Sequence, residues 1–364
     1  MKKITAVIMA ALLGAALLSG CSGSDNSTDT TASTAGTQQT EAATEGDTEE
    51  TTAENTTQAE TDETVTEKID ISIAALKGPT AIGMVKVMED AANDMTANHY
   101  DFTIAGTADE ITASLLSGDI QIAAVPANLA SVLYNRSQGG IRVAAINTLG
   151  VLYILETGDT IQSVADLEGK TIYSTGAGTT PEYTLRYLLG AYGIDPDQDV
   201  TIEYKSEATE VAAILSEADD AVAMLPQPYV TTVMMNNDKV RIALDVTEEW
   251  EAVSENGSSV VTGVVAVNSA FLEENQEAVD AFLEEYAASA AFVNESVEEA
   301  AALVESFDIF KAAVAERAIP YCNVTFIRGD EMKDKLSGYL QTLFDQNADS
   351  IGGAMPEDDF YYAE

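Results

Sequence analysis

Apolar residues occur with two different spacings from residue 68 onward. Isoleucines at positions 69, 71 and 73 alternate with other residues as in a strand, and apolar residues at 84, 87, 88, 91 and 95 then follow helical spacing. Similar signals predict strands near 101–105, 120–125 and 141–146, and helices over 107–117 and from Pro126. Strands that alternate with helices at these lengths predict an α/β fold, with a parallel sheet covered on both faces.

This order of elements occurs twice. Residues 110–115 align without a gap with 210–215, most of 119–126 aligns with 219–226, and 141–145 correspond to 240–244. The second copy predicts strands near Thr171, Thr201, Ala221 and Val240. We therefore expect two similar doubly wound lobes.

Two further apolar runs connect the copies. Residues 151–155 lead into the second copy and 260–267 lead out of it, so we expect two crossover strands between the lobes. The region after residue 269 is nearly all helical, with helices predicted over 271–293, 297–305, 309–318 and 330–346 that pack back on the first lobe. Residues 68–152 and 264–364 would form lobe 1 and residues 153–263 lobe 2, with a hinged cleft between them.

The first 21 residues predict export. Lys2 and Lys3 precede an apolar run over 4–18, and Leu18-Ser19-Gly20-Cys21 ends the segment with small residues before a cysteine. This pattern is typical of a secretory signal with a lipobox, and the apolar run is shorter than the roughly twenty residues that a membrane-spanning helix needs. We expect lipid on Cys21 and an extracytoplasmic protein anchored to the cell membrane. An ordinary signal peptide with a chance cysteine is the alternative.

Residues 22–67 have the composition of a stalk. They contain twelve acidic residues and no basic residue, and Val65 is their only large aliphatic residue. Such a segment cannot bury enough apolar surface to offset the entropy of ordering it, and its like charges repel one another. We expect a disordered, acidic, Thr-rich tether behind the lipid.

Charge and residue counts argue against several functions. The chain has a net charge of −44, and beyond residue 67 its 15 basic and 49 acidic residues leave −34, so nucleic acid is a poor partner. Cys322 has no second cysteine to pair with once Cys21 carries lipid. His99 is the only histidine, which argues against His-rich zinc sites and most acyl-transfer triads. We interpret Cys322 and His99 as structural, and expect no metal and no cofactor.

Four segments follow predicted strands and begin predicted helices, where free backbone amides can hold a ligand. They are Lys77-Gly78-Pro79-Thr80, Pro126-Ala127-Asn128, Gly176-Ala177-Gly178-Thr179-Thr180 and Pro226-Gln227-Pro228-Tyr229. Thr179 and Glu182 have capping-box spacing, and the glycines and threonines before them offer amides and hydroxyls. Asn147 and Thr148, at the end of a predicted strand, could add side-chain hydrogen bonds.

Each candidate also has a structural interpretation. Proline at a helix start after a strand is ordinary in α/β proteins, and Lys77 either faces a ligand or is a solvated turn lysine. Tyr183 and Tyr229, one turn into their helices, either line the cleft as flat walls or serve packing. No Gly-Lys-Ser/Thr follows the glycine-rich loop, so nucleotide hydrolysis is not supported.

Several motifs occur together between residue 68 and about residue 280. They are Gly78-Pro79-Thr80, Ser117-Gly118-Asp119-Ile120, Asp166-Leu167-Glu168-Gly169-Lys170, Gly176 to Thr180 and Leu225-Pro226-Gln227-Pro228. In this combination the chain resembles the nitrate/sulfonate/taurine-type substrate-binding proteins of ABC importers. The resemblance implies a periplasmic-binding-protein type II fold, a small-molecule solute held by the cleft loops, an ABC permease as partner, a monomer, and no catalysis.

The nature of the solute stays open at this point. No Arg lies in the predicted rim loops, which argues against a sulfonate or nitrate-like anion and leaves room for a less charged solute, such as a pyrimidine vitamin precursor. A ligand-sensing surface lipoprotein is one alternative function. An enzyme on the same fold is another, although no acid/base pair at a persuasive spacing supports it.

Overall fold

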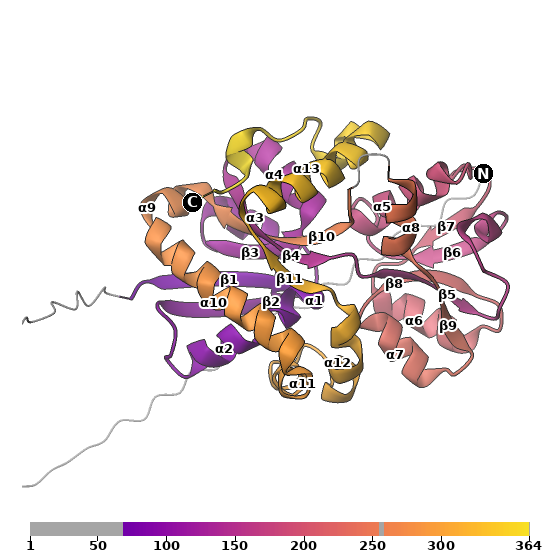
Figure 1. The fold of residues 1–364 in the computed structure, drawn as a ribbon, viewed down its shortest axis with the longest axis horizontal. Helices are drawn as coiled ribbons and strands as arrows, with labels where there is room; N and C mark the ends of the chain where they lie inside the picture. The colour runs from indigo at the N-terminus through magenta and orange to yellow at the C-terminus, as the bar shows by residue number, and fades with distance from the viewer. Residues whose placement is uncertain (1–67, 255–257, 364) are drawn as a thin grey trace, which may run out of the picture. The chain divides into compact units, whose positions relative to one another are not determined.

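The computed structural model describes residues 68–254 and 258–363. Our predictions of a signal segment over 1–21, lipid on Cys21 and a stalk over 22–67 concern residues outside this range. The described residues form two β-sheets with helices around them (Figure 1).

The first sheet has six strands in the order β11-β4-β10-β3-β1-β2. They are β1 (Asp70–Leu76), β2 (His99–Ala105), β3 (Ile122–Pro126), β4 (Ile141–Leu149), β10 (Val261–Asn268) and β11 (Val324–Ile327). β1 is parallel to β2 and β3, whereas β10 is antiparallel to both β3 and β4. The strand that returns from the second copy is therefore inserted between the third and fourth strands of the first.

The second sheet has five strands in the order β7-β6-β8-β5-β9. They are β5 (Leu152–Thr157), β6 (Thr171–Ser174), β7 (Thr201–Tyr204), β8 (Val222–Pro226) and β9 (Val240–Asp245). β5, which arrives from the first copy, is antiparallel to β8 and β9. Each sheet thus has the order second, first, third, incoming strand, fourth, which confirms the repeat and the two crossovers predicted from the sequence.

Alternating residues of the strands face two separate cores. In β1, Ile71, Ile73 and Ala75 belong to one buried cluster and Ala74 to another, and in β5 the residues Leu152 and Ile154 are separated in the same way from Tyr153 and Leu155. Because both faces are buried, the inner strands β3 and β8 are almost wholly apolar, whereas the edge strand β2 alternates polar with apolar residues. This confirms the prediction that helices cover both faces of each sheet.

The helices of the two copies occupy matching places. Those of the first are α1 (Pro79–Ile82), α2 (Val85–Ala92), α3 (Asp109–Ser117) and α4 (Ala127–Ser137). Those of the second are α5 (Thr180–Ala191), α6 (Ala208–Glu217), α7 (Tyr229–Asn236) and α8 (Val246–Val253). Figure 1 shows α3 and α4 on one side of the six-stranded sheet and α2 on the other.

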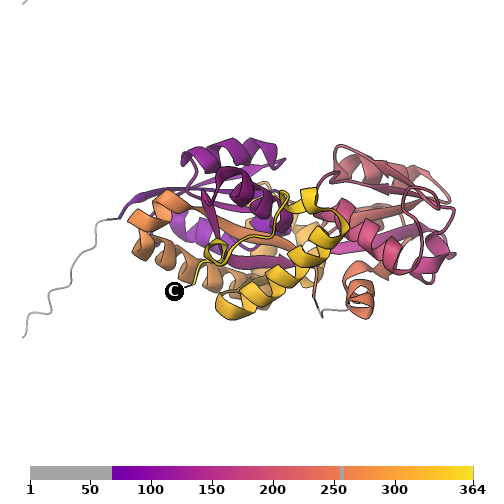
Figure 2. The same ribbon diagram turned by 90° about the horizontal axis from the view of Figure 1, so that it is seen from above.

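The C-terminal segment packs on the six-stranded sheet, as predicted. Its helices are α9 (Ser269–Glu274), α10 (Gln276–Glu295), α11 (Val297–Ser306), α12 (Ala312–Ala318) and α13 (Gly329–Gln346). Residues of α10 to α12 join the cluster that contains Ile71, and residues of α13 join the cluster on the opposite face. Figure 2 shows these orange and yellow helices from a second direction.

One element of this segment was not predicted. Residues 324–327 form the short strand β11, which pairs antiparallel with β4, instead of a connection between helices. The sequence Val-Thr-Phe-Ile favours a strand, but four residues are too few to stand out in a segment with helical spacing. The edge of β4 supplies the partner that makes this strand possible.

Candidate functional site

Three predicted segments meet around Gly263 in β10. Gly263 pairs with Pro126 of β3 on one side and with Thr148 of β4 on the other. A Cβ atom on Gly263 would lie 2.5 Å from Asn147 Oδ1 and 2.7 Å from Thr80 Cγ2. The structure therefore brings together the segments that contain Thr80, Pro126 and Asn147, and only glycine leaves room for this approach.

The pairing of β4 with β10 is irregular at this place. Gly263 is opposite Thr148, but the next residue, Val264, is opposite Ile146, so Asn147 has no partner in the strand pair. An extra residue of this kind forms a β-bulge, which turns a side chain away from the direction it would have in a regular strand. Bulges are frequent beside functional sites.

Buried polar atoms without partners surround this bulge. Both side-chain atoms of Asn147 and the hydroxyls of Thr148 and Tyr286 have no hydrogen-bond partner that meets normal geometry among the described residues, and all three residues are fully buried. We call Asn147, Thr148 and Tyr286 the Asn147 cluster. Tyr286 belongs to α10, and its hydroxyl would lie 2.9 Å from a Cβ on Gly83, just after α1.

The groups that affect the Tyr286 hydroxyl are uncharged. Burial raises the pKa of Tyr286, the nearby Asn147 amide opposes this rise, and no charged residue contributes to it. Thr80, which lies against the same glycine, uses its hydroxyl to donate to the Leu76 carbonyl at 2.8 Å. The polar groups around Gly263 are therefore neutral amides and hydroxyls.

The first predicted segment lies at the end of β1. Gly78 has a φ of 145° and precedes α1, which begins with Pro79, while the amide of Lys77 donates to the Ala105 carbonyl at 2.9 Å. The Lys77 side chain is exposed and forms no ion pair with the described residues. This exposed position fits a solvated turn lysine and also leaves the ammonium group accessible to a ligand.

The glycine-rich loop before α5 does not form the predicted capping box. The Thr179 hydroxyl donates to the Gly176 carbonyl at 2.7 Å, and the Glu182 carboxylate accepts from the Gly178 amide at 2.7 Å. Glu182 reaches Gly178 instead of Thr179 because Gly176 and Gly178, with φ values of 75° and 76°, curl the loop back toward the helix. The amides of Gly178 and Thr179 in this loop are therefore already paired. Ala177 is exposed at its tip.

A hydrogen bond joins the second and third segments. The Thr180 hydroxyl donates to Asn128 Oδ1 at 3.3 Å, and Asn128 Nδ2 donates to the Ser350 carbonyl at 3.1 Å. Thr180 begins α5 beside the five-stranded sheet, whereas Asn128 and the buried Ala127 begin α4 beside the six-stranded sheet. Asn128 thus connects three parts of the chain.

The fourth segment makes mainly structural contacts. The Gln227 side-chain oxygen accepts from the amide and the hydroxyl of Thr231, at 3.2 and 2.8 Å, and the Gln227–Pro228 peptide bond is cis. Pro226 pairs with Leu152 at the start of β5. The half-buried Tyr229 packs its ring edge to face on Phe310, with 5.3 Å between ring centroids. These contacts favour the packing interpretation of Tyr229.

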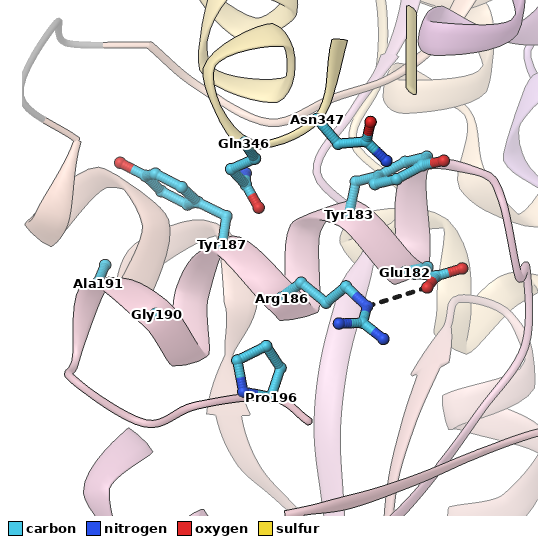
Figure 3. A pocket seen from close by; sticks show the side chains of 9 residues that line it. All are labelled: Glu182, Tyr183, Arg186, Tyr187, Gly190, Ala191, Pro196, Gln346 and Asn347. Carbon is cyan, nitrogen blue, oxygen red and sulfur yellow. Dashed lines mark hydrogen bonds and ion pairs between the residues drawn. The ribbon is translucent and has the colours of Figure 1, made fainter. Parts of the chain in front are cut away.

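A groove of about 640 Å³ lies along α5 (Figure 3). Tyr183 is the only residue of the predicted site in its lining. The lining residues are Glu182, Tyr183, Arg186, Tyr187, Gly190, Ala191, Pro196, Gln346 and Asn347. This groove was not predicted, because most of its lining comes from α5 and the rest includes Gln346 and Asn347, which are far away in the sequence.

Arg186 is the one arginine in this groove. It pairs with Glu182 at 2.9 Å and with Asp197 at 3.0 Å. The four-residue spacing of Glu182 and Arg186 on one helix was the available sequence signal. Because two carboxylates balance one guanidinium, the groove does not present the net positive charge that an anion carrier needs.

The remaining chemical candidates are limited. Cys322 is a buried free thiol, and burial raises its pKa, which fits a structural role. Within residues 68–254 and 258–363, no group of His, Cys, Asp and Glu side chains could hold a metal ion. No helix in the same part of the chain is long and apolar enough to cross a membrane.

Known structures share this fold. An ABC transporter protein from Parabacteroides distasonis is 21% identical over 81% of this chain and 99% of its own, with a TM-score of 0.67. The periplasmic aliphatic sulphonate binding protein SsuA from Escherichia coli is 14% identical over 79% and 92%, with a TM-score of 0.64. The ligand binding component of an ABC-type import system from Staphylococcus aureus, with zinc bound, is 14% identical over 81% and 97%, with a TM-score of 0.63.

The sequence itself matches a protein family. A search of curated proteins finds no match. The family described as NMT1/THI5 like matches residues 105–300, which is more than half of the chain. The match includes the candidate segments from Pro126 onward but not residues 77–80. The chain belongs to the NMT1/THI5-like family.

Proposed function

We propose that this chain is the extracytoplasmic solute-binding subunit of an ABC importer. The observation that carries the proposal is the matching order of the two sheets, each of which contains one strand that arrives from the other half of the chain. Two connections of this kind permit the halves to open and close as rigid bodies. The solute would be a small organic molecule, from among sulfonates, nitrate-like anions and pyrimidine vitamin precursors. No chemical step on the solute is part of the proposal.

The two sheets would be the cores of the two lobes. Lobe 1 would comprise residues 68–152 and the chain from Val261, because β10 lies in the six-stranded sheet from that residue onward. The second boundary would then fall slightly before residue 264. The hinge would lie around the two crossovers, near residues 151–155 and 260–267.

The anchor and the partner complete the proposal. Lipid on Cys21 and the acidic segment over 22–67 would hold a monomeric receptor at the membrane surface, where it can reach a permease. The lipobox pattern and the family support this arrangement.

A thermal-shift screen of the purified mature chain tests the proposal. A solute that binds only the folded state raises the melting temperature as its concentration rises above the dissociation constant. Sulfonates, nitrate, amino acids and vitamin precursors form the screen, and calorimetry confirms each hit. The proposal fails if no small solute shifts the melting temperature and the chain also does not bind membranes that contain its genomically adjacent permease.

Replacing Gly178 by valine should weaken solute binding about tenfold with little loss of stability. A Cβ on Gly178 meets no atom within 4 Å, but the φ of 76° is unfavourable for valine, so the loop should change conformation locally. Gly169, with a φ of 77° and equally open surroundings, is the matched control outside the site. Calorimetry and thermal melting of both variants check this. Equal affinity of both variants for the solute would remove the loop from the site.

A further inference from the structure

The Asn147 cluster is unusual because it places polar side chains at fully buried positions. Asn147, Thr148 and Tyr286 are fully buried, yet their side-chain polar atoms lack protein partners of normal geometry. Buried polar groups in proteins are nearly always paired, so each such group calls for an explanation. Apolar residues of the same size would pack at these positions without that penalty.

The cluster lies at the place where a solute is expected. It is at the carboxyl end of β4, next to the ends of β1 and β3, and the Thr80 methyl lies against the same glycine. α1 is close to the ends of β3, β4 and β11 and follows directly on the Gly78 turn. The end of this helix lies against the cluster, because the Tyr286 hydroxyl is 2.9 Å from a Cβ placed on Gly83.

The groups of the Asn147 cluster are uncharged, and together they can both donate and accept hydrogen bonds. Asn147 offers two N–H donors and one carbonyl acceptor, and each of the two hydroxyls can donate or accept. No charged residue contributes to the pKa of Tyr286. An anion placed here would be buried without a cation, which is costly, whereas a neutral group with an adjacent donor and acceptor would pair with the Asn147 amide.

We propose that Asn147 and Tyr286, with Thr148, read a neutral amide-like group of the solute, such as a carboxamide, a cyclic amide or a urea, and thereby select against sulfonate and nitrate. This inference rests on the proposed solute-binding function and names the residues that determine its specificity. Tyr286 is 139 positions from Asn147 and lies in none of the four candidate ligand segments.

Two isosteric variants test whether the cluster is unpaired in the free protein. Asn147→Leu and Tyr286→Phe should leave the melting temperature unchanged or raise it, because each removes a buried polar group that makes no hydrogen bond of normal geometry with the described residues. Tyr339→Phe is the matched control. Tyr339 is also fully buried, but its hydroxyl lies 3.3 Å from the Thr184 hydroxyl, so its loss should lower the melting temperature by about 2–4 °C. Equal losses in Tyr286→Phe and Tyr339→Phe would give Tyr286 a structural role and overturn the inference.

Binding measurements complete the test. Nicotinamide, hydantoin and 2-pyrrolidinone are the neutral probes, and nitrate, methanesulfonate and ethanesulfonate are the anionic probes. We expect at least one neutral probe to raise the melting temperature of the wild type, and Asn147→Leu and Tyr286→Phe to weaken its binding at least tenfold while Tyr339→Phe does not. Binding of anions alone, unaffected by Asn147→Leu, would overturn the inference and leave the proposed function standing. No shift with either set would count against the proposed function itself.

Discussion

Replacing Gly263 by valine should abolish solute binding and lower the free energy of unfolding by about 1–3 kcal/mol, the usual cost of overpacking. The first added carbon would already lie 2.5 Å from Asn147 Oδ1 and 2.7 Å from Thr80 Cγ2. Asn147 is fully buried and Thr80 nearly so, so neither can move out into solvent without a change in the surrounding chain. Both the Asn147 cluster and the start of α1 should therefore be displaced. Calorimetric titration and urea denaturation measure the two effects.

Gly190→Trp is the control for this prediction. Gly190 lies in α5 and lines the groove of Figure 3, and a Cβ there meets no atom within 4 Å. A tryptophan at this position fills the groove without entering the strand ends. We expect unchanged solute affinity. The reverse result, loss of binding in Gly190→Trp but not in Gly263→Val, would place the solute in the groove beside Tyr183 and Arg186.

Replacing Trp250 by alanine should lower the free energy of unfolding by about 3–5 kcal/mol, the cost of removing a large buried ring. Trp250, in α8, is the only tryptophan of the chain and is fully buried. Its ring lies 4.1 Å from that of Tyr187 in α5 and 5.5 Å from that of Tyr339 in α13, measured between centroids. Its indole nitrogen donates to the Ser258 carbonyl at 3.1 Å. The contact therefore connects helices of both halves of the chain.

Denaturation followed by circular dichroism measures this loss. Trp250→Phe keeps an aromatic ring between the two tyrosines and should lose clearly less than Trp250→Ala. Since Trp250 touches both halves, its fluorescence in the wild type should also change when solute binds. A loss below about 1 kcal/mol in Trp250→Ala would show that these aromatic contacts contribute little to holding the halves together.

The candidate site was predictable in part. Thr80, Pro126 and Asn147 were selected because each follows a strand, and parallel strands that end at one edge of a sheet must bring such residues together. The capping box of Thr179 and Glu182 was wrong, because the same spacing allows Glu182 to bond to Gly178. The spacing of two residues in the sequence shows that they can meet at a helix start. It does not show which of several nearby backbone amides the carboxylate will accept a hydrogen bond from.

The sequence by itself determined the overall architecture of this protein. The spacing of apolar residues reports which faces are buried, and a repeat of that spacing implies a repeat of the sheet, so two similar halves and two crossovers followed from local information. The tertiary structure alone decided what lies beside Gly263. Asn147, Gly263 and Tyr286 belong to three different elements, and Asn147 and Tyr286 are more than one hundred positions apart in the sequence. Their meeting depends on the insertion of β10 between β3 and β4, on the bulge at Asn147 and on the packing of α10, and no local pattern encodes a contact between such distant residues.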